Sequence, residues 1–305
     1  MTYTQVLNKT LSIYREKGEL AAYEFVSKEA LVLLGDYPQI DNFRYALAAA
    51  AGKKKEAMAI MRQAIEDKGY WYSYDYLAKD EDLNSLRGEE DFVRWLDLCK
   101  EREENALANP ESKLLVEGKN DGEKPLFLVL HGDQENIEIT RPYWDGLLDQ
   151  GYVLALLQSS QIEFSHGYNW RDVNQGVSEV GTYFEALMKD ESISKDSWIG
   201  GFSAGCNVAL RAILDGAVTA DRFVFVAPWL PDLEEWKEEL SMLKDKGISG
   251  HILVGDQDHD CLEGAEQLAV ELMEMGVYVS FEKIEGLGHD YPTDFQAKLQ
   301  EWIKE

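Results

Sequence analysis

The spacing of apolar residues divides the chain into two parts. Before about residue 105, apolar side chains recur at helical spacing and no strand-like block appears. After about residue 110, short β-rich apolar blocks alternate with amphipathic stretches. A polar segment that contains Pro110 separates the two patterns. We therefore expect three regions: a helical domain over residues 1–105, a linker over 106–111 and an α/β domain over 112–305.

The helical part contains an internal repeat. Gly18 is followed by Ala30, and Gly52 by Ala64, so a Gly/Ala pair recurs after 34 residues. This period, with small residues where two helices must approach closely, resembles tetratricopeptide-type (TPR) helical hairpins. The third unit departs from the pattern, and the chain lacks the Trp and Pro of the full repeat. An ordinary helical bundle is the alternative.

The second part predicts a sheet of mostly parallel strands. The apolar blocks that we interpret as strands span residues 114–118, 126–132, 152–158, 197–202, 223–228, 251–255 and 277–284. Helical patterns between and after them include residues 173–189, 204–215, 232–245, 261–275 and 293–304. Strands that alternate with helices form βαβ units, and nearly continuous apolar strands are buried on both faces. The fold expected is α/β with an open, doubly wound sheet, whose reactive groups lie at the carboxyl ends of the strands.

Charge and composition indicate which partners and which cellular compartment to expect. The formal net charge of −27 would repel nucleic acid and anionic membranes, so neither is expected as a partner. The first residues show no basic segment followed by an apolar one, and no apolar run approaches about 18 residues. Three cysteines, Cys99, Cys206 and Cys261, fit free thiols in a reducing compartment. We expect a soluble cytoplasmic protein.

Ser203 stands where a predicted strand passes into a predicted helix. Gly201 and Gly205 flank it in the pattern G-x-S-x-G, which suits a strained turn that exposes a nucleophilic hydroxyl. A serine needs a base and an orienting acid to become a nucleophile. Two later predicted strands are followed by Asp258 and His289, in the order that such a triad requires.

Other residues near these positions leave alternatives open. Asp256 and Asp260 compete with Asp258 for the acid, and His259 competes with His289 for the base. These carboxylates and imidazoles also suit a divalent metal ion. A metal site would leave the turn at Ser203 without a purpose, so we expect neither a metal nor a cofactor.

A carbonyl attacked by Ser203 would become an oxyanion that needs hydrogen-bond donors. One donor expected is the backbone N–H of Ala204, directly after the nucleophile. The other is expected in the loop after His131 and Gly132, from the backbone N–H of Asp133 or Gln134. His131 itself is interpreted as a structural residue of this turn.

The four signatures strand-HG, strand-GFSAG, strand-GDQD and strand-GLGH resemble the α/β-hydrolase superfamily over residues 112–305. The resemblance favours Asp258 as the acid, through the pattern G-x-x-D. The tract QSSQIEFSHGYNWRD resembles the loop after the fourth strand of the carboxylesterase/lysophospholipase-like branch, where a Trp lies close before an Asp, as Trp170 and Asp172 do here. This resemblance implies a serine hydrolase that cleaves a small-molecule ester or thioester through an acyl-enzyme and needs no cofactor.

The surroundings of the site leave several possibilities. Side chains that could line a substrate pocket, or only pack, are Tyr168, Trp170, Phe202 and Trp229. The segment after strand 223–228 is too short for a large lid, so the helical domain is expected either to cover the pocket mouth or to bind a protein partner. A peptidase and a catalytically silent adaptor are the alternative functions.

Overall fold

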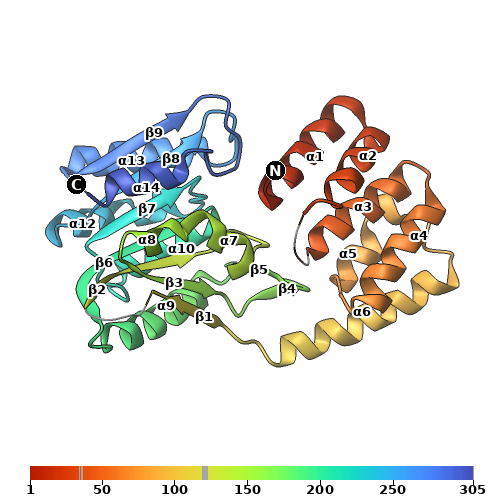
Figure 1. The fold of residues 1–305 in the computed structure, drawn as a ribbon, viewed down its shortest axis with the longest axis horizontal. Helices are drawn as coiled ribbons and strands as arrows, with labels where there is room; N and C mark the ends of the chain where they lie inside the picture. The colour runs from red at the N-terminus through yellow and green to blue at the C-terminus, as the bar shows by residue number, and fades with distance from the viewer. Residues whose placement is uncertain (34, 36, 119–122, 305) are drawn as a thin grey trace. The chain divides into compact units, whose positions relative to one another are not determined.

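In the computed structural model, which describes residues 1–33, 35, 37–118 and 123–304, the chain divides into two units (Figure 1). The first comprises Met1–Pro110 together with Ile162–Gly167, and the second comprises Glu111–Gln161 and Tyr168–Glu305. The main boundary lies close to the one expected from sequence. The difference is the short segment 162–167, which interrupts the α/β part in sequence and belongs to the helical unit.

The first unit is built from helices. Its elements are α1 (Tyr3–Lys17), α2 (Glu19–Glu29), α3 (Pro38–Ala50), α4 (Lys54–Arg62), a π-helical turn (Gln63–Asp67), α5 (Tyr74–Lys79), a 3-10 turn (Glu81–Leu83) and α6 (Glu90–Ala108). Its core includes fully buried Tyr45, Tyr72, Phe92 and Trp95. Because α6 continues to Ala108, about half of the predicted linker 106–111 is helical.

Gly18 and Gly52 occupy the turns of the two predicted helical hairpins, for a reason other than the one expected. Their φ angles are +81° and +73°, and a Cβ placed on either would meet no described atom within 4 Å. Glycine is therefore required by the left-handed backbone of each turn and not by close approach of two helices. The 34-residue period thus reflects a glycine with positive φ in the turn of each hairpin.

The second unit contains a seven-stranded sheet in the order β1-β3-β2-β6-β7-β8-β9. The strands are β1 (Lys113–Glu117), β2 (Lys124–Leu130), β3 (Val153–Gln158), β6 (Ile193–Phe202), β7 (Arg222–Val226), β8 (Ser249–Gly255) and β9 (Val279–Ile284). Only the edge strand β1 pairs antiparallel, with β3, among the pairs of this sheet. The expected α/β fold with a mostly parallel sheet is confirmed.

Helices cover both faces of this sheet. Successive side chains of β2 enter different cores: Leu128 and Leu130 lie in one cluster, and Phe127 and Val129 in the other. The first cluster packs against α9 (Val173–Met188), α10 (Ala204–Leu214), α12 (Ser241–Asp245) and α13 (Leu262–Met275). The second packs against α7 (Ile137–Trp144), α8 (Gly146–Asp149) and α14 (Phe295–Trp302). The sheet is doubly wound, as its apolar strands predict.

The connection between β7 and β8 is short and irregular. The single helix predicted over 232–245 is split into α11 (Leu233–Trp236), a 3-10 turn (Lys237–Leu240) and α12. In the described part of the chain, no helix is both long and apolar enough to cross a membrane.

A small hairpin was not predicted. Strands β4 (Ile162–Phe164) and β5 (Gly167–Tyr168) pair with each other after β3. Phe164 is buried in the core of the helical unit, and the N–H of Trp71 donates to Ser165 Oγ at 2.7 Å while Ser165 N–H donates to the Trp71 carbonyl at 3.0 Å. Strands of two and three residues carry too little periodicity to be found from sequence.

Candidate active site

Ser203 lies in a strained turn between β6 and α10. Its φ of +52° and ψ of −122° place it in a backbone region that side-chain-bearing residues rarely adopt. Three hydrogen bonds hold this backbone: Ser203 N–H donates to the Val226 carbonyl at 3.0 Å, and the Ser203 carbonyl accepts from Cys206 N–H and Trp229 N–H at 3.0 and 3.3 Å. The surrounding chain therefore maintains the strain.

The two glycines of G-x-S-x-G are required by close backbone contacts. A Cβ on Gly201 would lie 2.9 Å from the carbonyl carbon of Gly205, so strand and helix cross too closely for a side chain. A Cβ on Gly205 would lie 2.4 Å from the His131 carbonyl oxygen, at the end of β2. The motif thus packs the start of α10 against two neighbouring strands.

The structure brings Ser203, His289 and Asp258 together. Ser203 Oγ lies 2.9 Å from His289 Nε2, and His289 Nδ1 lies 2.8 Å from Asp258 Oδ2. Asp258 is 3% exposed, whereas the His289 side chain is 35% exposed. The imidazole therefore contacts the hydroxyl through one nitrogen and the buried carboxylate through the other, as a base that takes the hydroxyl proton would need to do.

The loops that carry Asp258 and His289 are joined through their backbones. Gln257 N–H donates to the Leu287 carbonyl at 2.9 Å, and Gly286 N–H donates to Asp256 Oδ1 at 2.8 Å. Asp256 thus supports the turn that presents His289, while Asp258 contacts the imidazole. His259 and Asp260 lie on the exposed side of the same loop.

The charge on the imidazole is favoured by its surroundings. Burial lowers the pKa of His289, but the hydrogen bond and negative charge of Asp258, with further acidic groups, outweigh this and raise it above 6.5. An imidazolium formed by accepting a proton from Ser203 would be stabilised by the same groups.

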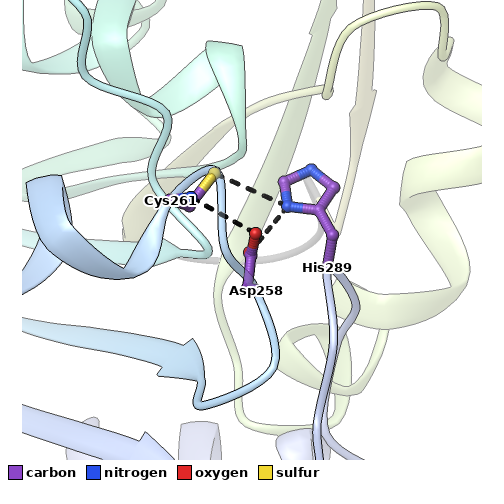
Figure 2. A group of neighbouring side chains, drawn as sticks. All are labelled: Asp258, Cys261 and His289. Atoms are coloured by element: carbon purple, nitrogen blue, oxygen red, sulfur yellow. Dashed lines mark hydrogen bonds and ion pairs between the residues drawn. The ribbon is translucent and has the colours of Figure 1, made fainter.

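Cys261 adjoins this pair, as Figure 2 shows. Its Sγ lies 3.6 Å from His289 Nδ1, and its N–H donates to Asp258 Oδ1 at 3.3 Å. Burial raises the pKa of this thiol well above its ordinary value. Sequence reasoning gave Cys261 no role at the site, although it directly follows the acidic loop.

These three residues also form a group whose ligand atoms lie within 4.8 Å of one another, as a metal site requires. It differs from the set considered from sequence, because Cys261 takes the place of Asp256 and Asp260. An ion bound to His289 Nδ1 would displace the proton that this nitrogen shares with Asp258. Metal binding and the hydrogen-bonded arrangement therefore compete for one nitrogen atom.

His131 supports the loop between β2 and α7 in a fixed neutral form. Ser159 N–H donates to its Nε2 at 3.1 Å, so Nδ1 carries the proton and donates to the Gly132 carbonyl at 2.6 Å. Burial lowers the pKa of His131 to about 4. His131 is a structural residue of the turn, as expected.

The expected oxyanion donors lie around this turn. Ala204 is the first residue of α10, where backbone N–H groups have no acceptor within the helix. Gln134 has a φ of +60°, and Asp133 before it has an exposed side chain. The loop that holds both follows His131, whose carbonyl contacts the start of α10 through Gly205.

The four aromatic residues considered for a pocket differ in exposure. Trp170 is buried, stacks on His131 with ring centroids 4.8 Å apart, and donates its Nε1–H to the His131 carbonyl at 2.9 Å. Phe202 is buried and stacks on Tyr291 at 4.6 Å. These contacts explain both rings as packing residues.

Tyr168 and Trp229 are placed differently. The backbone N–H of Tyr168 donates to the Glu135 carbonyl at 3.1 Å, and its side chain is half-buried. Trp229 is 44% exposed, and its N–H bonds the Ser203 carbonyl, so this ring is accessible beside the turn. Of the four, Trp229 is best placed to meet a ligand.

Comparisons with known proteins agree with this architecture. Residues 2–107 match the family described as A/B hydrolase-like, N-terminal domain. An uncharacterized protein from Bacillus cereus ATCC 10987 is 45% identical over 100% of this chain and 99% of its own, with a TM-score of 0.59. A comparison with curated proteins returned no match.

Two carboxylesterase structures share the fold of the α/β unit. The carboxylesterase of Bacillus cereus is 18% identical over 66% of this chain and 97% of its own, with a TM-score of 0.51. The carboxylesterase from Mesorhizobium loti is 19% identical over 63% of this chain and 98% of its own, with a TM-score of 0.50. None of these matches supports the tetratricopeptide resemblance of the helical part. The doubly wound sheet and these shared folds show that the second unit has an α/β-hydrolase fold.

Proposed function

We propose that the protein is a serine hydrolase that cleaves a carboxylic ester or thioester of a small molecule. The observation that carries the proposal is the continuous contact from Ser203 Oγ through His289 to the buried carboxylate of Asp258, at 2.9 and 2.8 Å. A serine held at a positive φ at the start of a helix, with a base in contact, is the arrangement of a nucleophile.

In the first half of the proposed reaction, Ser203 Oγ attacks the carbonyl carbon while His289 Nε2 takes the hydroxyl proton. Asp258 holds His289 in the tautomer that leaves Nε2 free to accept this proton. The oxyanion would accept hydrogen bonds from Ala204 N–H and from the backbone N–H of Asp133 or Gln134. His289 then returns the proton to the leaving alcohol or thiol, which leaves an acyl group on Ser203.

In the second half, water replaces the leaving group. His289 takes a proton from the water, the hydroxide attacks the acyl carbon, and Ser203 leaves as the proton returns to it. Every proton transfer uses the same imidazole nitrogen, so the residues of this chain are sufficient for the cycle. The solved structures named as carboxylesterases support an ester over a peptide as the substrate class.

The test is covalent labelling by a fluorophosphonate probe, followed by turnover of p-nitrophenyl esters of increasing chain length. We expect the wild-type protein to label at Ser203, and the Ser203→Ala and His289→Ala variants to lose ester turnover by at least about 10³-fold. Ser178→Ala, which removes an exposed hydroxyl on α9, is the matched control and should behave as wild type. Labelling that persists in Ser203→Ala, or its absence in a folded wild-type sample, would refute the proposal.

A further inference from the structure

Glu135 is a buried carboxyl group beside the loop where oxyanion donors are expected. It is 5% exposed and lies just before α7, in the run His131-Gly132-Asp133-Gln134-Glu135. Neither the sequence patterns nor the mechanism above gives it a role. A buried acidic group in such a place needs hydrogen bonds and a reason to be retained.

The side chain and the backbone of Glu135 both hold this loop. Its Oε2 accepts from Gly132 N–H at 3.0 Å and from the Thr140 hydroxyl at 3.4 Å. Its own N–H donates to the Gly132 carbonyl at 3.3 Å. Asp133 and Gln134 are therefore enclosed between two residues that are bonded to each other twice, so their backbone orientation depends on Glu135.

The carboxyl group of Glu135 packs closely against Gly132. A Cβ on Gly132 would lie 3.1 Å from Glu135 Oε2 and 2.6 Å from Phe202 Cδ1. A side chain at position 132 would therefore collide with both the carboxyl group of Glu135 and the ring of Phe202, the residue before Ser203.

Glu135 also interacts electrostatically with His289. Burial raises the pKa of Glu135 to about 7, and the charge of His289 opposes this rise. Reciprocally, the charge of Glu135 helps to raise the pKa of His289. Asp290 and Tyr291, which follow His289 in the same loop, also interact electrostatically with Glu135.

We propose that Glu135 is a positioning residue of the hydrolytic reaction, which holds residues 132–134 in the conformation that presents an oxyanion donor. This inference rests on the proposed function. The hydrogen bond from Gly132 N–H to Glu135 needs an acceptor oxygen and no charge.

Two substitutions test the role of this acceptor. Glu135→Gln keeps an acceptor for Gly132 N–H and nearly the same shape, but removes the charge. Glu135→Ala removes both the acceptor and the charge. Glu138→Gln and Glu138→Ala are matched controls, because Glu138 is exposed in the first turn of α7, three residues away.

The experiment measures kcat and KM for a p-nitrophenyl ester from pH 5 to 9. The burst of p-nitrophenol counts functional sites, so that kcat refers to folded enzyme. For Glu135→Ala we expect kcat to fall about 10²-fold, as on loss of an oxyanion donor, with KM within about threefold of wild type. For Glu135→Gln we expect most of this loss to be restored, because the amide oxygen can still accept from Gly132 N–H.

The results that would overturn the inference are distinct from failure of the proposed function. If Glu135→Ala matches the Glu138 controls in kcat per titrated site, or if Glu135→Gln falls as far as Glu135→Ala, the acceptor does not set the loop geometry and Glu135 only stabilises the fold. If Glu135→Ala does not fold, a fall in kcat per titrated site for folded Glu135→Gln as large as that on loss of an oxyanion donor rejects the proposal, because this variant keeps the acceptor. Absence of Ser203-dependent labelling in wild type would instead refute the proposed hydrolase activity.

Discussion

Gly255 and Leu287 are in backbone contact: a Cβ on Gly255 would lie 2.0 Å from the Leu287 carbonyl oxygen. Gly255 ends β8 three residues before Asp258, and Leu287 lies two residues before His289. The distance between the acid and the imidazole is therefore fixed by two main chains that touch. Side-chain flexibility contributes little to it.

Replacing Gly255 by Ala should separate these two loops. The added methyl group meets backbone atoms that cannot rotate away, so we expect a loss of about 3 kcal/mol in the free energy of unfolding. Because a displacement of about 1 Å at a reacting group can cost about 10²-fold in rate, ester turnover should fall by at least that factor. Urea unfolding and p-nitrophenyl ester turnover measure the two effects.

Gly288→Ala is the control for this prediction. Within the described structure, a Cβ at position 288 meets nothing within 4 Å, although the residue adjoins His289. Equal effects of the two substitutions would show that the contact at Gly255 does not set the geometry.

The pH dependence of turnover should report the charge of Asp258. Since His289 must be neutral to accept a proton and its pKa is raised above 6.5, activity should increase with pH through a limb above that value. In Asp258→Asn the negative charge that raises the pKa of His289 is lost while its burial remains. The rise of activity with pH should therefore occur at lower pH, and kcat should fall about 10⁴-fold. Asp260→Asn, at an exposed position, should shift this pH dependence only slightly. An unshifted limb in Asp258→Asn would contradict this account of the pKa.

Thiol reagents should leave the enzyme active. All three cysteines are buried, and burial raises the pKa of the Cys261 thiol, so the reactive thiolate is scarce at neutral pH. We expect iodoacetamide to leave ester turnover unchanged in the native protein and to alkylate all three cysteines in denaturant, as measured by mass spectrometry. Rapid inactivation that parallels alkylation of Cys261 would show that this site opens to solvent.

Asp290 should make stability depend on pH. Burial raises its pKa to about 6 from 3.8, so the folded state binds its proton more tightly than the unfolded state. The stability from this proton is complete below about pH 3.8 and is lost as the pH rises through about 6. Asp290→Asn carries no charge and can still accept from Tyr291 N–H, so above pH 6 it should be more stable than wild type by up to about 3 kcal/mol.

Urea unfolding at pH 4 and pH 8 measures this difference between Asp290→Asn and wild type. The advantage of the variant should be present at pH 8 and nearly absent at pH 4. An equal difference at the two pH values would mean that the carboxyl group titrates normally.

What the sequence predicted correctly depends on local rules. The strained turn at Ser203 follows from glycines at fixed offsets, and the positions of Asp258 and His289 follow from the rule that parallel strands end at one edge. Contacts between distant segments have no such local signature. The approach of Cys261 to His289, for example, joins two loops that are 28 residues apart in the sequence.

The turns at Gly18 and Gly52 show the limit of reasoning from residue type. The sequence associated these glycines with close approach of two helices, but glycine serves both close packing and left-handed backbone. Only the angle distinguishes the two, and the angle here is left-handed. Similarly, the segment 232–245 was predicted as one helix and is broken into shorter ones, although it contains no Gly or Pro that would indicate a break.

The helical unit is built from two separate segments of the chain, because it includes Phe164 and Ser165 of the β4–β5 hairpin. A fragment that ends at Pro110 would lack the ring that completes part of its apolar interior, and the backbone groups of Trp71 would lose both partners on Ser165. The matched family ends at residue 107, yet the structural unit also uses residues 162–167. An exchange of the helical unit between relatives would therefore have to transfer the hairpin together with residues 1–110.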